Sequence, residues 1–208
     1  MPERPRGDSP ATKRCEEHEM PQMSTKKRLL DHAEDVFRRK GFHGASVQDI
    51  TSAAGTPKGS FYNHFDSKQQ LAAEIVHRYA EATDFSALHT ERPALERLHT
   101  HLTAQLDRVG ETGARFGCLL GTFAGDSTTA GEEVRRNVQA ALTAWADQIS
   151  LTIEQGQATG EITTRHPAAV LASFLLDVME GVFLRTKPWG EHASAAEEIG
   201  IALDALRP

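Results

Sequence analysis

The chain has 208 residues, a formal net charge of -6 and two cysteines. This length allows one domain of ordinary size, or a small domain joined to a larger one, with a real buried core. Taken alone, the acidic total argues against a nucleic-acid-binding protein, so the distribution of charge decides more than its sum. Two cysteines exclude a disulfide framework and favour a reducing compartment, so we expect a cytoplasmic protein.

Residues 1–22 mix Pro, Gly, Ser and both charge signs without apolar periodicity. We therefore expect a disordered tail and no signal peptide. No apolar run approaches the ~20 residues of a membrane-spanning helix. The best candidate, residues 168–176, is ended by Asp177. We expect no membrane partner.

Two helices are predicted within residues 24–54. In residues 24–40 apolar side chains recur at helical spacing, and Gly41 is expected to stop the helix. Ser46 then fits the N-cap of a second helix, with Asp49 three residues later completing a partial capping box. Gly55 can adopt the left-handed conformation that closes this second helix.

A third helix is predicted to begin at Thr56-Pro57, an N-cap followed by proline at the first helical position. Phe61 and Phe65 are four residues apart and are expected to pack inward. The residues left on the outer side are Lys58, Gly59, Ser60, Tyr62, Asn63 and His64. A helix of about two turns with such a face suits the DNA major groove, where base edges present donors and acceptors. Residues 44–68 are therefore interpreted as a helix-turn-helix.

The distribution of charge agrees with this interpretation. Residues 24–70 hold eight Lys/Arg against five Asp/Glu, a net charge of +3. Residues 71–208 hold eleven against nineteen, a net charge of -8. Only the N-terminal part should therefore meet phosphate. We divide the chain into a tail (1–22), a helix-turn-helix domain (23–70) and a larger domain (71–208).

The larger domain is expected to be helical throughout. Ser67, with Gln70 three residues later, begins a long helix that runs to about residue 83. Further apolar stripes predict helices over the ranges 94–109, 116–124, 131–157, 167–187 and 193–206. The helix over 167–187 has so little polar face that it needs burial beyond its own monomer. Since no alternating strand pattern occurs, the predicted fold class is all-α.

The helix-turn-helix segment resembles the signature of the TetR family of transcriptional regulators. The matching residues, at fixed spacing without a gap, are Ser46, Ile50, Ala54-Gly55, Lys58-Gly59, Phe61-Tyr62, His64-Phe65 and Ser67-Lys68. The resemblance implies about nine helices, a homodimer on a palindromic double-stranded DNA operator, and a small-molecule effector. It also implies that the last two helices form a four-helix bundle with a second subunit, which would cover the apolar helix.

The resemblance further implies which residues contact DNA. In the family, some positions of the recognition helix contact bases or phosphates, and here these positions hold Lys58, Gly59, Tyr62, Asn63 and His64, with Ser60 alongside. Other positions at helix ends clamp the DNA backbone, and here these hold Ser46, Gln48 and Lys68. Lys58 offers hydrogen bonds to guanine, and Gly59 lets the helix approach closely. For Tyr62, packing beneath the helix is the alternative.

A second segment, Gly117-Cys118-Leu119-Leu120-Gly121, concerns the effector. In the first turn of a short helix, Cys118 would meet unpaired amides that favour thiolate, with Arg115 close in sequence. The segment is similar to one in a TetR branch that includes repressors responding to reactive electrophiles and acrylate-like compounds. In that branch a late lysine can lie near the cysteine, and Lys187 stands at a comparable place. The alternative is an inert cysteine, since burial raises the pKa of a thiol.

An effector pocket is expected inside the larger domain. Candidate lining residues are Phe116, Cys118, Phe123, Trp145, Phe174, Met179 and Lys187, although such residues are more often plain core. Asp177 and Glu180 either orient a ligand, face solvent or pair with an arginine. His99 and His101 are two apart, a poor spacing for metal on a helix, so neither a metal site nor a cofactor is expected.

The predicted function is a ligand-responsive DNA-binding regulator, a repressor released from its operator by a small molecule or electrophile, and not an enzyme. An enzyme with Cys118 as nucleophile is the alternative from another class. It lacks a nearby histidine or an oxyanion motif. A sequence-indifferent DNA-binding protein is a third possibility, disfavoured by the acidic net charge.

Overall fold

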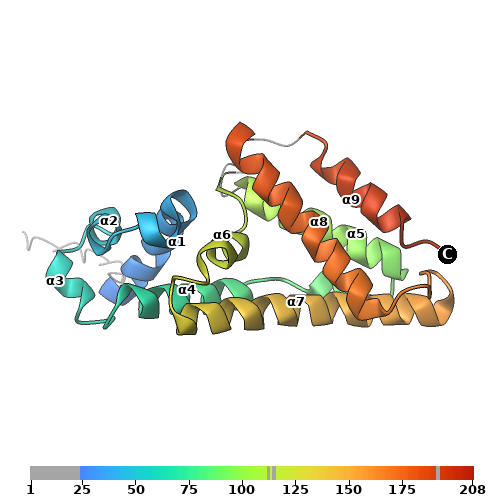
Figure 1. Cartoon of the computed structure of the whole chain (residues 1–208), viewed down its shortest axis with the longest axis horizontal. Coiled ribbons are helices and arrows are strands. Elements are labelled where there is room, and N and C mark those ends of the chain that lie inside the picture. The colour runs from blue at the N-terminus through green and yellow to red at the C-terminus, as the bar shows by residue number, and fades with distance from the viewer. Residues whose placement is uncertain (1–23, 112, 114–115, 191–192) are drawn as a thin grey trace, which may run out of the picture.

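A computed structural model describes residues 24–111, 113, 116–190 and 193–208 (Figure 1). The described residues are helical with short loops and include no strand, which confirms the all-α prediction. The elements are α1 (Thr25–Gly44), α2 (Val47–Ala53), α3 (Lys58–Phe61), α4 (Lys68–Glu81), the 3-10 helix η1 (Ser86–His89), α5 (Ala94–Glu111), α6 (Leu119–Asp126), α7 (Glu132–Thr159), α8 (Ala168–Trp189) and α9 (Ala195–Asp204). The predicted disordered tail lies outside the described residues.

Helices α1–α3 form a small head at one end of the molecule (Figure 1). Its centre is apolar, since Phe37, Ile50 and Phe61 are fully buried. The backbone of Gly41 (φ 67°, ψ 177°) breaks α1 where the sequence predicts, and a short turn continues to Gly44. The head is thus held by side chains from all three helices around one core.

The start and length of α3 differ from the prediction. Pro57, with φ -61° and ψ 143°, is the N-cap, so Thr56 is not. The Thr56 hydroxyl instead lies 3.5 Å from the carbonyl of Thr51, at the end of the preceding helix. The helix spans Lys58–Phe61 and ends at Tyr62, which is shorter than two turns. The remaining polar residues continue it as a turn.

The body comprises α4–α9 and is organised on α7, which runs along its whole length (Figure 1). Ser67 caps α4 as predicted, accepting a hydrogen bond from the amide of Gln70 at 3.1 Å. Helix α4 leaves the head and lies along α7, and α8 packs on the same long helix. The short α6 fills the space between the head and the body and contacts α1, α7 and α8.

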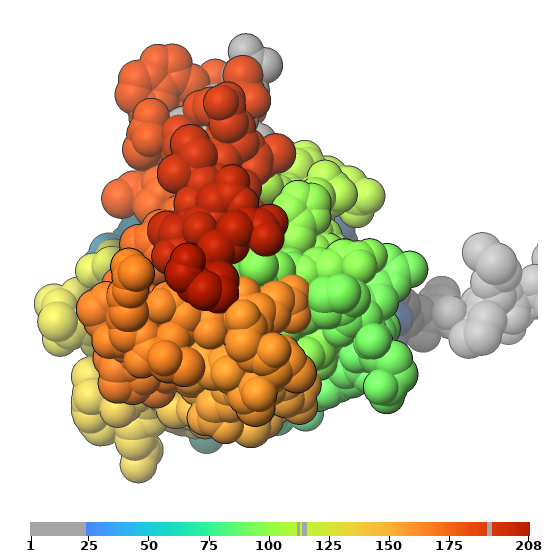
Figure 2. Space-filling view, turned by 90° about the vertical axis from the view of Figure 1, so that its right-hand side faces the viewer, coloured from blue at the N-terminus to red at the C-terminus, as the bar shows by residue number. Residues whose placement is uncertain are grey.

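Helix α8 leaves an apolar surface uncovered in the single chain. It runs through Pro188 to Trp189, two residues beyond the predicted end, because a proline in an exposed last turn removes only one terminal hydrogen bond. Val170, Phe174 and Leu184 are 55%, 40% and 66% exposed along it. Helix α9 packs on α5 and α8, as the end view shows (Figure 2).

The helices of the described residues include none that is both long enough and apolar enough to cross a membrane.

Candidate functional site

The start of α2 is fixed by a complete capping box. Ser46 Oγ accepts from the amide of Asp49 at 3.0 Å, and the Asp49 carboxylate accepts from the amide of Ser46 at 2.9 Å. Lys40 on α1 pairs with the same carboxylate at 2.6 Å. The Lys40 contact, followed by the Ser46 hydrogen bonds, holds the pKa of Asp49 well below its usual range. These contacts therefore hold the start of α2 in place without any bound ligand.

An arginine that the sequence analysis did not single out holds the turn between α2 and α3. The guanidinium of Arg28 on α1 donates to the carbonyls of Ala54 at 2.5 Å and Gly55 at 2.8 Å. Gly55 has φ +59°, the left-handed conformation predicted for it. A side chain at position 55 would be strained there and would crowd the Arg28 guanidinium.

Helix α3 and the turn after it present a polar outer surface. Phe61 and Phe65 are 0% and 2% exposed and point into the head, as predicted. The exposed residues are Lys58, Gly59, Tyr62, Asn63 and His64, with Ser60 half-buried. Tyr62 is 56% exposed and touches Phe61 edge-on, with ring centroids 5.2 Å apart. The alternative of Tyr62 packing beneath the helix is therefore wrong.

The three residues proposed to clamp a phosphate backbone differ in their surroundings. The Gln48 side chain is exposed and donates only to Ser52 Oγ, at 3.2 Å. Ser46 is exposed, but its hydroxyl donates to Asp49 Oδ2 at 2.7 Å. The Lys68 ammonium points inward and donates to the carbonyls of Phe42 at 2.6 Å and Ala45 at 2.7 Å. Burial accordingly lowers the pKa of Lys68.

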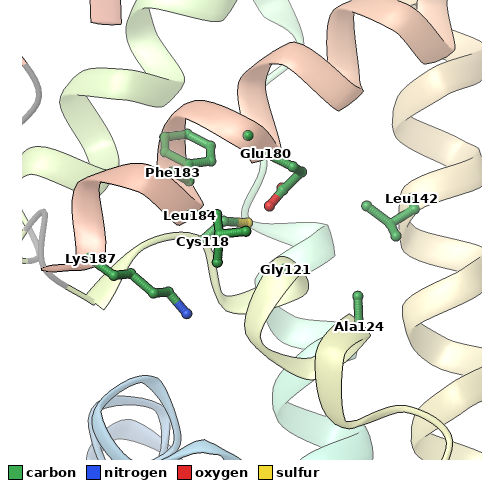
Figure 3. A pocket seen from close by; sticks show the side chains of 9 residues that line it. Cys118, Gly121, Ala124, Leu142, Glu180, Phe183, Leu184 and Lys187 are labelled. Atoms are coloured by element: carbon green, nitrogen blue, oxygen red, sulfur yellow. The ribbon is translucent and has the colours of Figure 1, made fainter.

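A cavity of about 270 Å³ lies between α6, α7 and α8, and we call it the α6–α8 cavity (Figure 3). Its lining residues are Cys118, Gly121, Ala124, Leu142, Glu180, Gly181, Phe183, Leu184 and Lys187. The lining is mostly apolar, and Glu180 and Lys187 are its charged members. The cavity brings together two residues that the sequence analysis paired, Cys118 and Lys187.

Cys118 is the N-cap of α6 and not a member of its first turn. The thiol is 1% exposed and lies within hydrogen-bonding distance of the Glu180 carboxyl and, at 3.8 Å, of the Tyr79 hydroxyl. Burial, followed by the negative charge of Glu180, raises the pKa of Cys118 to about 12. The prediction that the helix terminus favours thiolate is therefore wrong, because these two effects outweigh the few amides at the helix start. Arg115 lies outside the described residues.

The two charged groups of the cavity respond to burial in opposite ways. Burial raises the pKa of Glu180, which nearby Cys118 and Lys187 partly offset. Burial lowers the pKa of Lys187, whose ammonium donates to Thr122 Oγ1 at 2.9 Å. In Figure 3 the Glu180 carboxyl points into the cavity, whereas the Lys187 ammonium points toward α6 and away from the centre of the cavity.

Most of the other predicted lining residues lie elsewhere. Phe123 is fully buried against Phe37 of the head, and Trp145 donates its indole N–H to His101 at 2.8 Å. Phe116 lies under the guanidinium of Arg39. Phe174 and Asp177 are exposed, and Met179 is fully buried. None of these six residues lines the cavity. For Phe174, Asp177 and Met179 the reason is that α8 turns their sides toward solvent or toward the core.

Sequence reasoning missed the small residues of the cavity. Gly121 and Gly181 provide room on α6 and α8, and a Cβ at Gly121 would collide with the Glu180 carboxyl. Leu142 on α7 and Phe183 on α8 belong to the predicted apolar stripes, which do not indicate a cavity, and the sequence analysis does not single out Leu184 on α8. Glu180 was noticed as a polar residue on an apolar helix, which was the available signal.

The helix that lines the cavity also holds the head. At its end, Asp126 Oδ2 accepts a hydrogen bond from the amide of Phe42 at 2.7 Å. The hydroxyl of Thr129, just beyond α6, lies 2.6 Å from Nε2 of His43. At its start, the carbonyl of Gly117 accepts from Arg38 at 3.2 Å. Helix α6 thus contacts α1 at both ends and the cavity between them.

A metal site is not indicated in this part of the chain. Within the ranges that the structure describes, no group of three His, Cys, Asp or Glu residues is placed to hold a metal ion. Outside the cavity, His101 is buried on α5, and burial lowers its pKa to about 4.

Two family models match the chain. Residues 29–75 match the model described as bacterial regulatory proteins, tetR family, and residues 94–199 match the tetracyclin repressor-like C-terminal domain. The chain belongs to the TetR family of transcriptional regulators. As a TetR-family protein it is a ligand-responsive, DNA-binding transcriptional regulator.

Curated relatives extend over most of this TetR-family chain. It is 30% identical over 193 residues to the HTH-type transcriptional repressor DhaR of Mycobacterium sp. (strain GP1), covering 91% of this chain and 96% of the relative. It is 28% identical over 152 residues to the transcriptional regulator AcuR of Cereibacter sphaeroides, covering 71% and 69%.

Solved structures share the TetR fold. A TetR-family regulator from Agrobacterium tumefaciens superposes with a TM-score of 0.81 at 21% identity, covering 88% of this chain and 98% of that one. The reduced form of E. coli NemR gives a TM-score of 0.73 at 22% identity, covering 88% and 94%. The helix order described above is therefore that of the family.

Proposed function

We propose that the chain is a homodimeric repressor whose α3 reads a palindromic operator and whose α6–α8 cavity takes a small effector that weakens operator binding. The observation that carries this proposal is the placement of α6. One side of α6 lines the cavity through Cys118, Gly121 and Ala124. Its end accepts the amide of Phe42 in the head. An effector that displaces α6 therefore acts directly on the position of α1.

For DNA, we propose that Lys58, Tyr62 and His64 supply donors, and that Gly59 allows close approach. Asn63, Ser60, Gln48 and Ser46 border the same exposed surface. Lys68 is proposed to act indirectly, because its ammonium already joins two carbonyls at the end of α1. A short α3 contacts few base pairs, so a two-fold pair of heads is needed to read a longer site.

The proposed dimer uses the uncovered surface of α8 together with α9. Exposed Val170, Phe174 and Leu184 on α8, and Ile201 on α9, would be buried by a second copy. Gly181 and Gly200 have open space where a side chain would lie, which permits close approach of another helix. A dimer built this way fixes the distance between the two heads.

The proposed release mechanism is an equilibrium between two arrangements of the dimer. The effector binds more tightly to the arrangement whose head spacing does not fit the operator, and DNA then weakens effector binding by the same factor. We propose a non-covalent effector. Burial, followed by the charge of Glu180, raises the pKa of Cys118 to about 12, which supports a neutral thiol that acts as a wall of the cavity over a reactive sensor.

Selection of bound sequences from a random DNA pool tests the proposal. We expect enrichment of a palindrome, lost in Tyr62→Ala and retained in Arg136→Ala, which removes an exposed side chain from α7, outside the head. Because a base contact contributes ~1–3 kcal/mol, the Tyr62 variant should bind the selected site about 10–100-fold more weakly. Equal competition by random DNA would instead support a sequence-indifferent DNA-binding protein.

A further inference from the structure

The α6–α8 cavity contains one polar atom that nothing in the described chain satisfies. Glu180 Oε1 is buried and has no hydrogen-bond partner among the residues that the structure describes. Figure 3 shows the carboxyl pointing into the cavity, between Cys118 and Leu142. A buried acceptor without a donor costs free energy, and a ligand that brings a donor removes that cost.

The space around this carboxyl is kept free by glycine. A Cβ on residue 121 would collide with Glu180 Oε2, so any larger residue on α6 would force the carboxyl aside. Gly181, the next residue on α8, also lines the cavity and has no atom within 4 Å of an added Cβ. The carboxyl therefore faces an opening that accepts a ligand atom.

The charges of the cavity restrict the charge of its ligand. Glu180 disfavours an anion, and Lys187, whose ammonium donates to Thr122 beside the cavity, already supplies a positive charge that acts on Glu180. Both groups already sit in surroundings that disfavour charge, as their opposite responses to burial show. A charged ligand would add a third buried charge without a full partner, whereas a neutral ligand would not.

The size and walls of the cavity restrict the ligand further. Its volume of about 270 Å³ lies below the ~300–1,000 Å³ typical of sites for drug-sized molecules. Ala124, Leu142, Phe183 and Leu184 give it hydrocarbon walls. A short hydrocarbon chain or small ring fits these walls.

We infer that the effector is a small neutral molecule whose hydroxyl group donates to Glu180 Oε1 while its hydrocarbon part lies against Leu142 and Phe183. This inference rests on the proposed function, and it names the ligand class of the same cavity. Glu180 is then the residue that determines specificity, and Gly121 is the residue that leaves it room. Cys118 holds the carboxyl from the other side.

Four probes of equal size separate the possible ligand classes: 1-hexanol, methyl pentyl ether, hexylammonium and pentanoate. Their dissociation constants are measured near neutral pH by NMR titration of the full chain. We expect 1-hexanol to bind most tightly and the ether about tenfold or more weakly, since of these two only the alcohol brings a donor to the unpaired Glu180 oxygen. Tightest binding by pentanoate or hexylammonium would overturn the inference.

Variants of α8 and α6 show whether Glu180 is responsible. Glu180→Met keeps the length of the side chain but removes the acceptor, so the alcohol and the ether should bind within about twofold of each other. Asp177→Asn, an exposed carboxyl one turn earlier on the same helix, is the matched control and should keep the preference for the alcohol. A preference retained in Glu180→Met contradicts the inference. Because this variant could disturb packing, Gly121→Ala provides a second test, and it should weaken 1-hexanol about tenfold or more.

The outcomes separate this inference from the proposed function. If a palindrome is selected and no alcohol binds through Glu180, the ligand class is wrong and the proposal of a DNA-reading dimer stands. If alcohols bind through Glu180 and no palindrome is selected, the cavity chemistry is right and the DNA-reading proposal fails. Release of the selected DNA by 1-hexanol, abolished in Glu180→Met, supports both.

Discussion

The hydrogen bond between Asp126 and Phe42 offers a direct test of the contact between α6 and the head. Asp126 Oδ2 accepts the Phe42 amide at 2.7 Å, between residues 84 apart in the sequence. Asp126→Ala leaves this amide without its acceptor. Hydrogen bonds to charged groups contribute ~1.5–3 kcal/mol, and partial exposure reduces this, so we expect a loss of about 1–2 kcal/mol in the free energy of unfolding.

Two measurements check this loss. A loss of about 1–2 kcal/mol corresponds to a fall in Tm of roughly 2–8 °C for a chain of this size. Native-state hydrogen exchange should also show faster exchange at the Phe42 amide in Asp126→Ala. Asp126→Asn keeps an acceptor and should recover most of both effects. Thr129→Ala removes the exposed contact to His43 and should change stability by less than about 0.5 kcal/mol.

An unchanged Phe42 exchange rate in Asp126→Ala would refute the reasoning. It would mean that the Asp126 carboxylate does not protect the Phe42 amide. The coupling between cavity and head would then have to pass through other contacts, such as the hydrogen bond of Arg38 with the Gly117 carbonyl or the contact of α4 with α7.

Three further predictions concern charge and protonation. If Lys58 contacts a phosphate, Lys58→Ala should reduce the slope of log affinity for the selected operator against log salt concentration by about one. Arg136→Ala should leave this slope unchanged. Equal slopes in the Lys58 variant and the wild type would place Lys58 off the DNA backbone. Burial lowers the pKa of His101 from 6.5 to about 4, so the folded state disfavours the proton and the free energy of unfolding falls as the pH drops between these values, by about 3 kcal/mol at most. Urea unfolding at several pH values should show a shallower fall in His101→Gln than in the wild type. Parallel curves for the two proteins would count against a buried neutral histidine. In a Cys15→Ser background, iodoacetamide should modify Cys118 far more slowly in the native chain than in urea, because burial raises the pKa of this thiol to about 12. Mass spectrometry measures the extent of modification. Fast labelling of the native chain would restore the sensor hypothesis.

The sequence predicted those features that depend on neighbours close along the chain. The capping box of Ser46 and Asp49, the left-handed Gly55 and the Ser67 cap all involve residues at most three positions apart. Phe61 and Phe65 were placed inward from their spacing alone. Local hydrogen bonding and helical periodicity are enough to specify these features.

The features that sequence reasoning misjudged depend on contacts between distant segments. The protonation of Cys118 is set by Glu180 and by burial, and Glu180 is brought to it by the packing of α8 on α6. The carbonyls that the Lys68 ammonium meets, those of Phe42 and Ala45, likewise follow from the packing of α4 on α1, which periodicity alone does not predict. Periodicity specifies the side of a helix that is buried, but not the partner that it meets.

The position of Leu184 links the cavity to the outside of the molecule. This side chain lines the α6–α8 cavity, yet it is 66% exposed on the apolar side of α8. A second copy that packs on this side of α8 would therefore also cover Leu184 at the edge of the cavity. Association of two chains and ligand binding should then influence each other by the same factor, so an apparent dissociation constant for a ligand has meaning only together with the chain concentration at which it was obtained.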